Sequence, residues 1–277
     1  MTDYGHELRF GVFITPNAAD AEQIVKLARL ADREHLDLVT FQDHPYQRHF
    51  LDAWTLLSVV AAQTESIYLA PNVANLPLRL PVMLARSVAS LDILSRGRVQ
   101  LGLGAGSFWD SIEAVGGARR TPGESVDALS EAMDVIRAFW SDSDDPITFD
   151  GEHYRVGGAK PGPPPVKRVE MWLGAYKPRM LALTGRKADG WLPSSSYATP
   201  DKLGKMTEAI DAAAEAAGRD PREIRRLYNI NGDIGARQLA ELYHDFGISA
   251  FILSVSDATE IQRFAHEVAP MVRELVP

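Results

Sequence analysis

Short apolar runs with the character of β-strands alternate with helical patterns along the whole chain of 277 residues. Eight strand–helix pairs follow one another, and no linker-like boundary interrupts them. A doubly wound open sheet more often stops at five or six strands, so the count favours one α/β domain over residues 1–277, a (β/α)8 or TIM barrel. The predicted strands are residues 8–14, 36–41, 67–73, 99–103, 169–173, 188–192, 226–230 and 248–255.

One segment interrupts this regular alternation. Residues 141–168 lie before the fifth strand and are rich in proline and glycine. This composition predicts a hairpin-like excursion packed outside the barrel. A helix is expected ahead of it, because Thr121-Pro122-Gly123-Glu124 fits a capping box with proline at the first helical position.

Composition excludes several classes of function. The formal net charge of −8 argues against nucleic-acid and anionic-membrane partners, which require an excess of Lys and Arg. Cysteine is absent, so the chain has no disulfide, thiol nucleophile or thiolate metal site. No signal-peptide pattern is found, and no apolar run reaches the roughly 18 residues of a membrane span. We therefore expect a cytoplasmic protein that acts on a small molecule.

Three polar clusters each follow a predicted strand and precede a helical pattern. They are residues 42–46, 104–110 and 174–179. Repeated strand–helix units place such clusters at the same end of a parallel sheet. In a closed barrel, the carboxyl ends of the strands carry the catalytic residues. The clusters therefore predict an enzyme.

The first cluster contains the pair Asp43-His44. Histidine is the side chain most easily tuned for proton transfer near neutral pH, and a neighbouring carboxylate can orient it. A structural histidine that closes the loop is an equally good interpretation of these residues alone. A metal site is not expected, because no second histidine stands at ligand spacing.

The second cluster begins within the run Gly102-Leu103-Gly104-Ala105-Gly106. Its spacing is not that of the dinucleotide-binding fingerprint. Small residues at a strand end allow a flat ring or a phosphate to approach the backbone. Tight packing between strand and helix explains the same residues equally well.

The third cluster and the end of the third strand suggest ligand contacts. Pro178 suits the first turn of a helix, whose free amides together with Lys177 and Arg179 predict a phosphate site. Ordinary surface charge is the alternative. Asn72 and Asn75 could hydrogen-bond the carbonyl edge of a ligand, although asparagine more often forms turns.

Taken together, these segments resemble the luciferase-like monooxygenase superfamily, whose members are (β/α)8 barrels that use flavin or deazaflavin. The resemblance extends over nearly the whole chain, and the number of motifs in the same order makes it specific. The motifs are Phe10-Gly11-Val12, Gln42-Asp43-His44, Leu76-Pro77-Leu78-Arg79, Leu91-Asp92-Ile93-Leu94-Ser95-Arg96-Gly97-Arg98, Leu101-Gly102-Leu103-Gly104-Ala105-Gly106 and Ala188-Asp189-Gly190-Trp191.

Within the superfamily the chain looks most like the branch that uses coenzyme F-420, an 8-hydroxy-5-deazaflavin also written F420. The resemblance implies that Asp43 contacts the cofactor and that His44 is the catalytic acid or base. It also implies a cis peptide between Asn72 and Val73 that supports the ring. The resemblance also places Asn75, Ala105, Gly106 and Asp110 along the ring and ribityl chain. It implies that Tyr176, Lys177 and Arg179 hold the phosphate and that Ala175 is a further cofactor contact.

Two departures limit what the resemblance implies. Sugar-phosphate dehydrogenases of this branch carry a catalytic glutamate where this chain has Ser107. The segment after the seventh predicted strand, residues 231–235, leads almost at once into a helix, whereas many relatives have a long insertion there that covers the site. The expected activity is hydride transfer between F-420 and an unidentified small organic substrate. The alternatives are an FMN-dependent monooxygenase that uses oxygen, a non-catalytic cofactor carrier and, more distantly, a metal-dependent hydrolase; a homodimer is expected.

Overall fold

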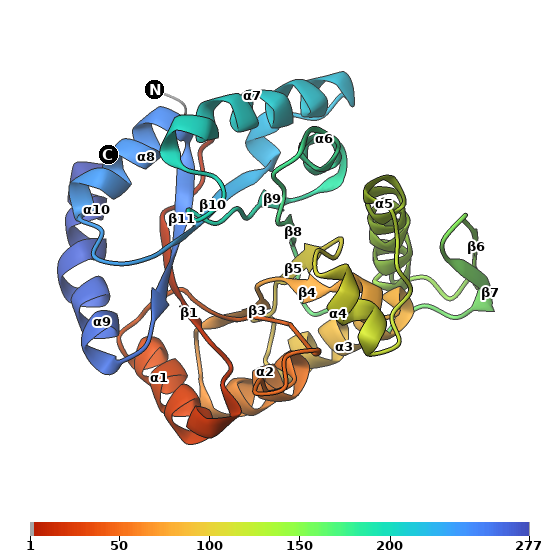
Figure 1. Cartoon of the computed structure of the whole chain (residues 1–277), viewed down its shortest axis with the longest axis horizontal. Coiled ribbons are helices and arrows are strands. Elements are labelled where there is room, and N and C mark those ends of the chain that lie inside the picture. The colour runs from red at the N-terminus through yellow and green to blue at the C-terminus, as the bar shows by residue number, and fades with distance from the viewer. Residues whose placement is uncertain (1–2, 277) are drawn as a thin grey trace.

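A parallel β-barrel forms the centre of the molecule, and the computed structural model describes it within residues 3–276 (Figure 1). Nine strand segments form one sheet in the order β3-β2-β1-β11-β10-β9-β8-β5-β4. The helices surround this sheet, as the eight strand–helix pairs predicted. The segments are β1 Arg9–Ile14, β2 Leu38–Phe41, β3 Tyr68–Pro71, β4 Ala74–Asn75, β5 Leu101–Gly104, β8 Met171–Leu173, β9 Gly190–Trp191, β10 Arg225–Ile230 and β11 Ile248–Val255.

Segments β3 and β4 are two parts of one barrel strand. The Leu69 amide of β3 donates to the Arg98 carbonyl (2.8 Å), and the Gln100 amide donates to the Leu69 carbonyl (2.9 Å). β4 then pairs in parallel with β5, so the two parts together close the barrel. The predicted eight-stranded fold is thereby confirmed. The break in the third strand lies at Asn72–Val73, where the expected cis peptide is present.

The helices cover the outside of the barrel (Figure 1). The predicted capping box at Thr121 is confirmed, because its side chain accepts from the Glu124 amide while the Glu124 carboxylate accepts from the Thr121 amide. The short helix α4 was not predicted. The helices are α1 Ala21–Arg33, α2 Ala53–Gln63, α3 Pro81–Leu94, α4 Trp109–Ala114, α5 Pro122–Phe139, α6 Pro178–Lys187, α7 Pro200–Ala216, α8 Ala236–Phe246, α9 Ala258–Arg263 and α10 Ala269–Leu275.

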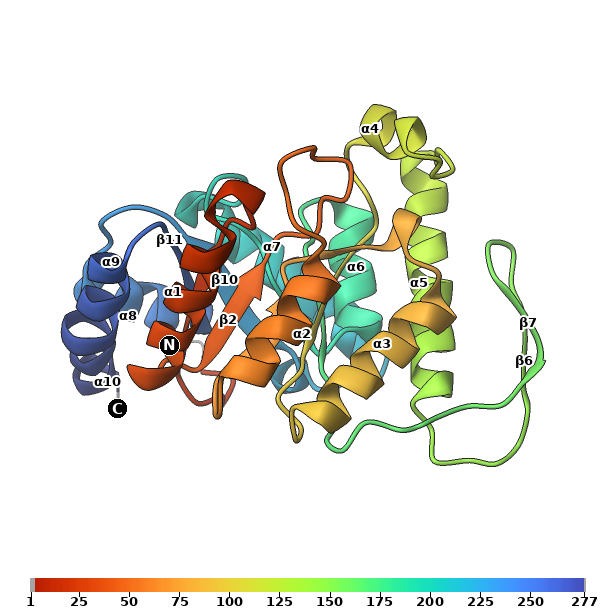
Figure 2. The ribbon, with the colours of Figure 1, turned by 90° about the horizontal axis from the view of Figure 1, so that it is seen from below.

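The predicted excursion before the fifth strand is an antiparallel hairpin outside the barrel. Its strands are β6, Ile147–Asp150, and β7, Arg155–Ala159, and they lie beside α5 (Figure 2). The Glu131 carboxylate of α5 accepts hydrogen bonds from the amides of three consecutive turn residues, 152–154. This carboxylate attaches the turn of the hairpin to the helix.

The barrel interior is filled by its own apolar layer, separate from the larger core between strands and helices. The fully buried Trp172 is the largest side chain of that layer. A filled interior makes the barrel a packed core and not a pore, as in other barrels of this type. The layer consists of Leu38, Ala70, Trp172, Leu192, Leu227, Ala250 and Ile252.

Candidate active site

The predicted site residues lie at the carboxyl ends of four neighbouring strands. These are β2, the divided strand β3–β4, β5 and β8, which are adjacent in the sheet. Figure 2 shows the loop after β2 and helix α4 at the same end of the barrel. The structure thus brings together the segments that carry the three polar clusters.

His44 lies in the loop after β2, partly buried among aromatic side chains. Its ring stacks on Tyr46 with 5.1 Å between centroids, and Phe108 meets it edge-on at 5.5 Å. The Gln42 side-chain nitrogen is 2.8 Å from Nδ1 of His44. Burial lowers the pKa of His44, although the charge of Asp43 acts in the opposite direction. A neutral imidazole held in this way can accept and return a proton near neutral pH.

Asp43 is buried, and both of its carboxylate oxygens accept from protein donors. Oδ2 accepts from the Asn75 backbone amide (2.9 Å) and from Nε of Arg79 (2.8 Å), and Oδ1 accepts from Nη2 of Arg79 (2.7 Å). Arg79 also pairs with Asp52 at 2.6 Å. Asp43 therefore fixes the position of the backbone at Asn75. A direct contact between Asp43 and a cofactor stays a prediction.

Asn75 has a polar group available for a ligand. Its side chain is buried, and Oδ1 has no hydrogen-bond partner among residues 3–276. A buried carboxamide oxygen without a partner costs free energy unless something else donates to it. The donor groups on the edge of a flavin-type ring fit this requirement.

Asn72 takes part in a hydrogen-bond network at the top of the interior layer. Its Nδ2 donates to Oδ1 of Asn229 (2.7 Å) and to Oγ1 of Thr40 (3.3 Å). The Asn229 Nδ2 donates back to Asn72 (3.3 Å). Asn229 was not among the predicted residues. Its position two residues after the inward-facing Leu227 was the available sequence signal, because alternate strand residues share a face.

The glycines at the end of β5 pack against the divided strand. A Cβ on Gly104 would lie 2.7 Å from Val73, and one on Gly102 would lie 2.2 Å from the Pro71 carbonyl oxygen. Gly106 has a φ of +95°, and a Cβ there would lie 2.6 Å from Pro77. For Gly102 and Gly104 the tight packing is against the divided strand, not between strand and helix as the alternative interpretation had it. Contacts of Ala105 and Gly106 with a cofactor stay predictions.

Helix α6 begins at Pro178 as predicted, but Arg179 differs from the expectation. Its Nη2 pairs with both carboxylate oxygens of Asp127, at 2.8 and 3.0 Å. The sequence suggested that a bound anion was needed to offset two cations here, whereas Asp127 already offsets one. Lys177 precedes the helix and is exposed, and no ion pair joins it within the described chain.

Tyr176 and Ala175 connect this turn to the next strand. The Tyr176 hydroxyl accepts from the Ser194 amide at 3.0 Å, and burial raises the pKa of Tyr176. The Ala175 carbonyl accepts from Nε1 of Trp191 at 2.9 Å. Both residues are thus held rigidly at the rim, and their contacts with a cofactor stay predictions.

Asp110 lies on the outer surface of α4. Its side chain is 96% exposed and pairs with Arg119. This placement gives no sign of a ligand contact for Asp110, and its predicted role is untested.

Two further features concern metal-binding and membrane-spanning classes of protein. In residues 3–276, no three His, Asp or Glu side chains gather where they could hold a metal ion. Over the same residues, no helix has the length and apolarity needed to cross a bilayer.

A parallel barrel with a histidine and an available carboxamide at its carboxyl rim is the arrangement of a barrel enzyme. The family model described as luciferase-like monooxygenase matches residues 8–268. The chain therefore belongs to the luciferase-like monooxygenase family, and the predicted resemblance is confirmed.

Three curated relatives show which members of the family are similar. The chain is 30% identical over 271 residues to a 5,10-methylenetetrahydromethanopterin reductase of Methanolobus tindarius, covering 96% of this chain and 77% of that protein. It is 31% identical to the F420-dependent hydroxymycolic acid dehydrogenase of Mycobacterium tuberculosis (strain ATCC 25618 / H37Rv), with coverage of 92% and 71%. It is 30% identical to the F420-dependent glucose-6-phosphate dehydrogenase of Nocardia farcinica, with coverage of 81% and 68%.

Solved structures share the fold at lower identity. An F420-dependent secondary alcohol dehydrogenase in complex with an F420-acetone adduct matches with a TM-score of 0.84 and 19% identity, covering 97% of this chain and 100% of that one. The coenzyme F420 dependent tetrahydromethanopterin reductase of Methanopyrus kandleri matches at 0.78 and 18%, with coverage of 96% and 99%. These matches confirm the barrel architecture.

Proposed function

We propose that this protein is an oxidoreductase that binds F420 at the carboxyl rim of the barrel and acts on a small organic substrate. The observation that carries the proposal is the buried Asn75 oxygen without a partner, on the strand next to the one that leads to His44. Two of the three curated relatives described above are named as F420-dependent, which supports this cofactor over FMN.

The bound deazaflavin would supply hydride chemistry at its ring, and the protein would supply binding and proton transfer. His44 moves the proton. The Gln42 side-chain nitrogen lies 2.8 Å from Nδ1 and 3.5 Å from Nε2 of His44, and it orients the ring. When a carbonyl is reduced, the imidazolium form of His44 would give a proton to the substrate oxygen and become the neutral ring, and in the reverse direction the neutral ring would take that proton from the hydroxyl.

Asp43 and Arg79 would orient the Asn75 side chain toward the ligand. Their buried ion pair fixes the backbone amide of Asn75, and with it the direction of the Asn75 carboxamide. Asn75 would then bind a polar edge of the ring. Asn72 and Val73 would support the ring, while Ala105, Gly106 and Ala175 would add backbone contacts.

The phosphate would bind at the start of α6. The first amides of that helix have no side-chain cap, and Lys177 stands beside them. A helix amino terminus and an ammonium group together favour an anion. Tyr176 completes this site, and Arg179 joins it if it leaves Asp127.

A titration of the purified protein with F420 and, separately, with FMN tests the proposal. We expect F420 to bind at least roughly ten-fold more tightly, and N75A to weaken F420 binding by about five- to ten-fold through loss of a buried hydrogen bond. Q63A, at an exposed position, is the control. Tight binding of FMN without F420 would favour the oxygen-using monooxygenase. F420 binding without turnover of any carbonyl compound would favour the carrier.

A cytoplasmic location stays a prediction. We further propose that the protein is a homodimer. Val59 of α2 and Leu80 and Met83 at the start of α3 are 43%, 68% and 58% exposed, and the two helices contact each other. Large exposed apolar side chains on adjacent helices favour burial against a second copy. The molar mass from light scattering should be twice that of one chain in the wild type and should fall toward one chain in L80E/M83E. A monomeric wild type would contradict the proposal.

A further inference from the structure

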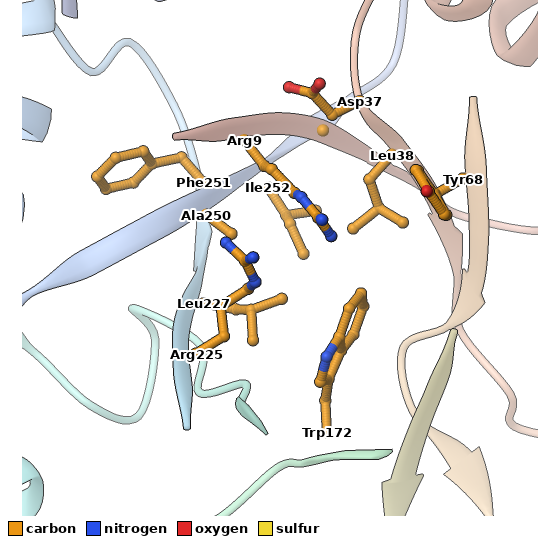
Figure 3. A pocket seen from close by; sticks show the side chains of 11 residues that line it. Arg9, Asp37, Leu38, Tyr68, Trp172, Arg225, Leu227, Ala250, Phe251 and Ile252 are labelled. Carbon is orange, nitrogen blue, oxygen red and sulfur yellow. The ribbon is translucent and has the colours of Figure 1, made fainter. Parts of the chain in front are cut away.

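A small cavity lies at the amino-terminal end of the barrel, at the opposite end from the candidate active site. Its volume is about 10 Å³, room for one species the size of a water molecule. Apolar side chains, among them Trp172 and Leu227, form most of its wall. The guanidinium groups of Arg9 and Arg225 point into the same space (Figure 3).

Both guanidinium groups have unused donors. Arg225 is 6% exposed, its Nη1 donates to the Glu7 carbonyl (3.0 Å), and its buried Nε has no hydrogen-bond partner among residues 3–276. The Arg9 guanidinium lies over the Tyr68 ring, 5.4 Å from its centroid. Within the same residues, no hydrogen bond from the Arg9 side chain is found. Two cations thus face one cavity, and within residues 3–276 neither guanidinium group donates a hydrogen bond to a carboxylate.

The nearest carboxylates are already engaged elsewhere. The Asp37 carboxylate accepts from the Phe10 amide at 2.7 Å, and Figure 3 shows it turned away from the two guanidinium groups. The Glu170 carboxylate accepts from Nε1 of Trp172 at 2.8 Å. It stands 3.9 Å from Nε of Arg225, too far for a hydrogen bond. Neither carboxylate supplies the missing acceptor within the cavity.

We propose that this cavity binds one small monovalent anion, chloride in ordinary salt solutions, between Arg9 and Arg225. An anion accepts from both guanidinium groups and offsets their repulsion. A water molecule would bring no charge and two protons, for which the apolar wall offers few acceptors. Burial and the charge of Arg9 both lower the pKa of Arg225, although the charges of Glu170, Glu7 and Asp37 act in the opposite direction. The anion would link the amino-terminal ends of β1 and β10, where Arg9 and Arg225 stand.

Crystals grown with sodium bromide in place of sodium chloride test the site directly. We expect an anomalous bromide peak within hydrogen-bond distance of both Arg9 and Arg225 in the wild type. R9Q should lose the peak, while R33Q, which removes an exposed arginine of α1, should keep it. Density for a water without an anomalous signal in the wild type would overturn the proposal.

A solution measurement separates a specific site from an adventitious ion. The Tm of the wild type and of R33Q should rise by roughly 2–4 °C as chloride replaces gluconate at constant ionic strength, because binding to the folded state stabilises it. The rise should be absent in R9Q. Equal responses of R9Q and the wild type, or a bromide peak without any rise in Tm, would indicate an adventitious ion only and overturn the proposal. If R9Q does not fold, the wild-type crystal and Tm series still decide.

Discussion

At the scale of single residues, the proposed proton transfer depends on His44 and the groups that hold its ring. The ring is held by Gln42 and enclosed by Tyr46 and Phe108, and its lowered pKa keeps it neutral. The sequence left proton transfer and a structural role in closing the loop as equal alternatives, and the catalytic role of His44 stays a prediction.

H44A should reduce turnover and spare cofactor binding. With a carbonyl compound that oxidises the reduced coenzyme, we expect kcat to fall by roughly 100- to 10,000-fold, the usual contribution of a general acid. The Kd for F420 should change little, because the ring interacts with other groups. Stopped-flow absorbance gives the rate, a fluorescence titration gives the Kd, and H49A is the control at an exposed histidine. Unchanged turnover in H44A would assign the ring a structural role.

D43N should destabilise the fold by about 3 kcal/mol, because it leaves the partly buried Arg79 without its main counter-ion. D52N removes only the more exposed partner of Arg79 and keeps a residue able to cap α2, so its cost should stay below about 1 kcal/mol. Denaturant unfolding measures both. Similar losses in the two variants would show that the buried position of Asp43 does not matter.

At the scale of elements, the turn into α6 decides where the phosphate binds. K177Q should weaken F420 binding by roughly five- to ten-fold and reduce its dependence on salt, since it removes an ammonium group beside uncapped amides. K187Q, at the other end of the same helix and paired with Asp134, is the matched control and should bind F420 as the wild type does. Equal affinities of the two variants would place the phosphate elsewhere.

The elements with strong periodicity were the predictable ones. Strand β11 was predicted with its observed bounds, and the capping box marked the start of α5 correctly. Helix α4 escaped detection because it is short and has only one buried residue, Ile112. The break between β3 and β4 was expected only from the family resemblance, because it depends on a backbone geometry that periodicity does not encode.

Within the site, residues next to each other in sequence were easier to predict than partners across the barrel. His44 and its neighbours follow one strand, so their position at the rim was predictable. The pairing of Arg179 with Asp127 and of Asn72 with Asn229 joins segments far apart in sequence. Such choices depend on which elements are adjacent in space, and a single sequence does not specify that.

At the scale of the whole molecule, buried titratable groups set the pH range of stability. Burial, together with the charges of Arg225 and Arg226, lowers the pKa of His6 from 6.5 to about 4. Between these values the unfolded chain binds more protons than the folded one, so the contribution of His6 makes the free energy of unfolding fall as pH falls from 6.5 toward 4. H6Q should lose less stability than the wild type over this range, whereas H49Q should match the wild type. Parallel curves for H6Q and the wild type would contradict this.

The central claim is that the carboxyl rim of the barrel holds the deazaflavin ring beside His44. A crystal structure of the wild-type protein grown with F420 tests it most directly. We predict density for the ring against Asn75 and His44 and for the phosphate at the start of α6. Density for F420 at another surface, or a rim that stays empty at saturating F420, would contradict the account.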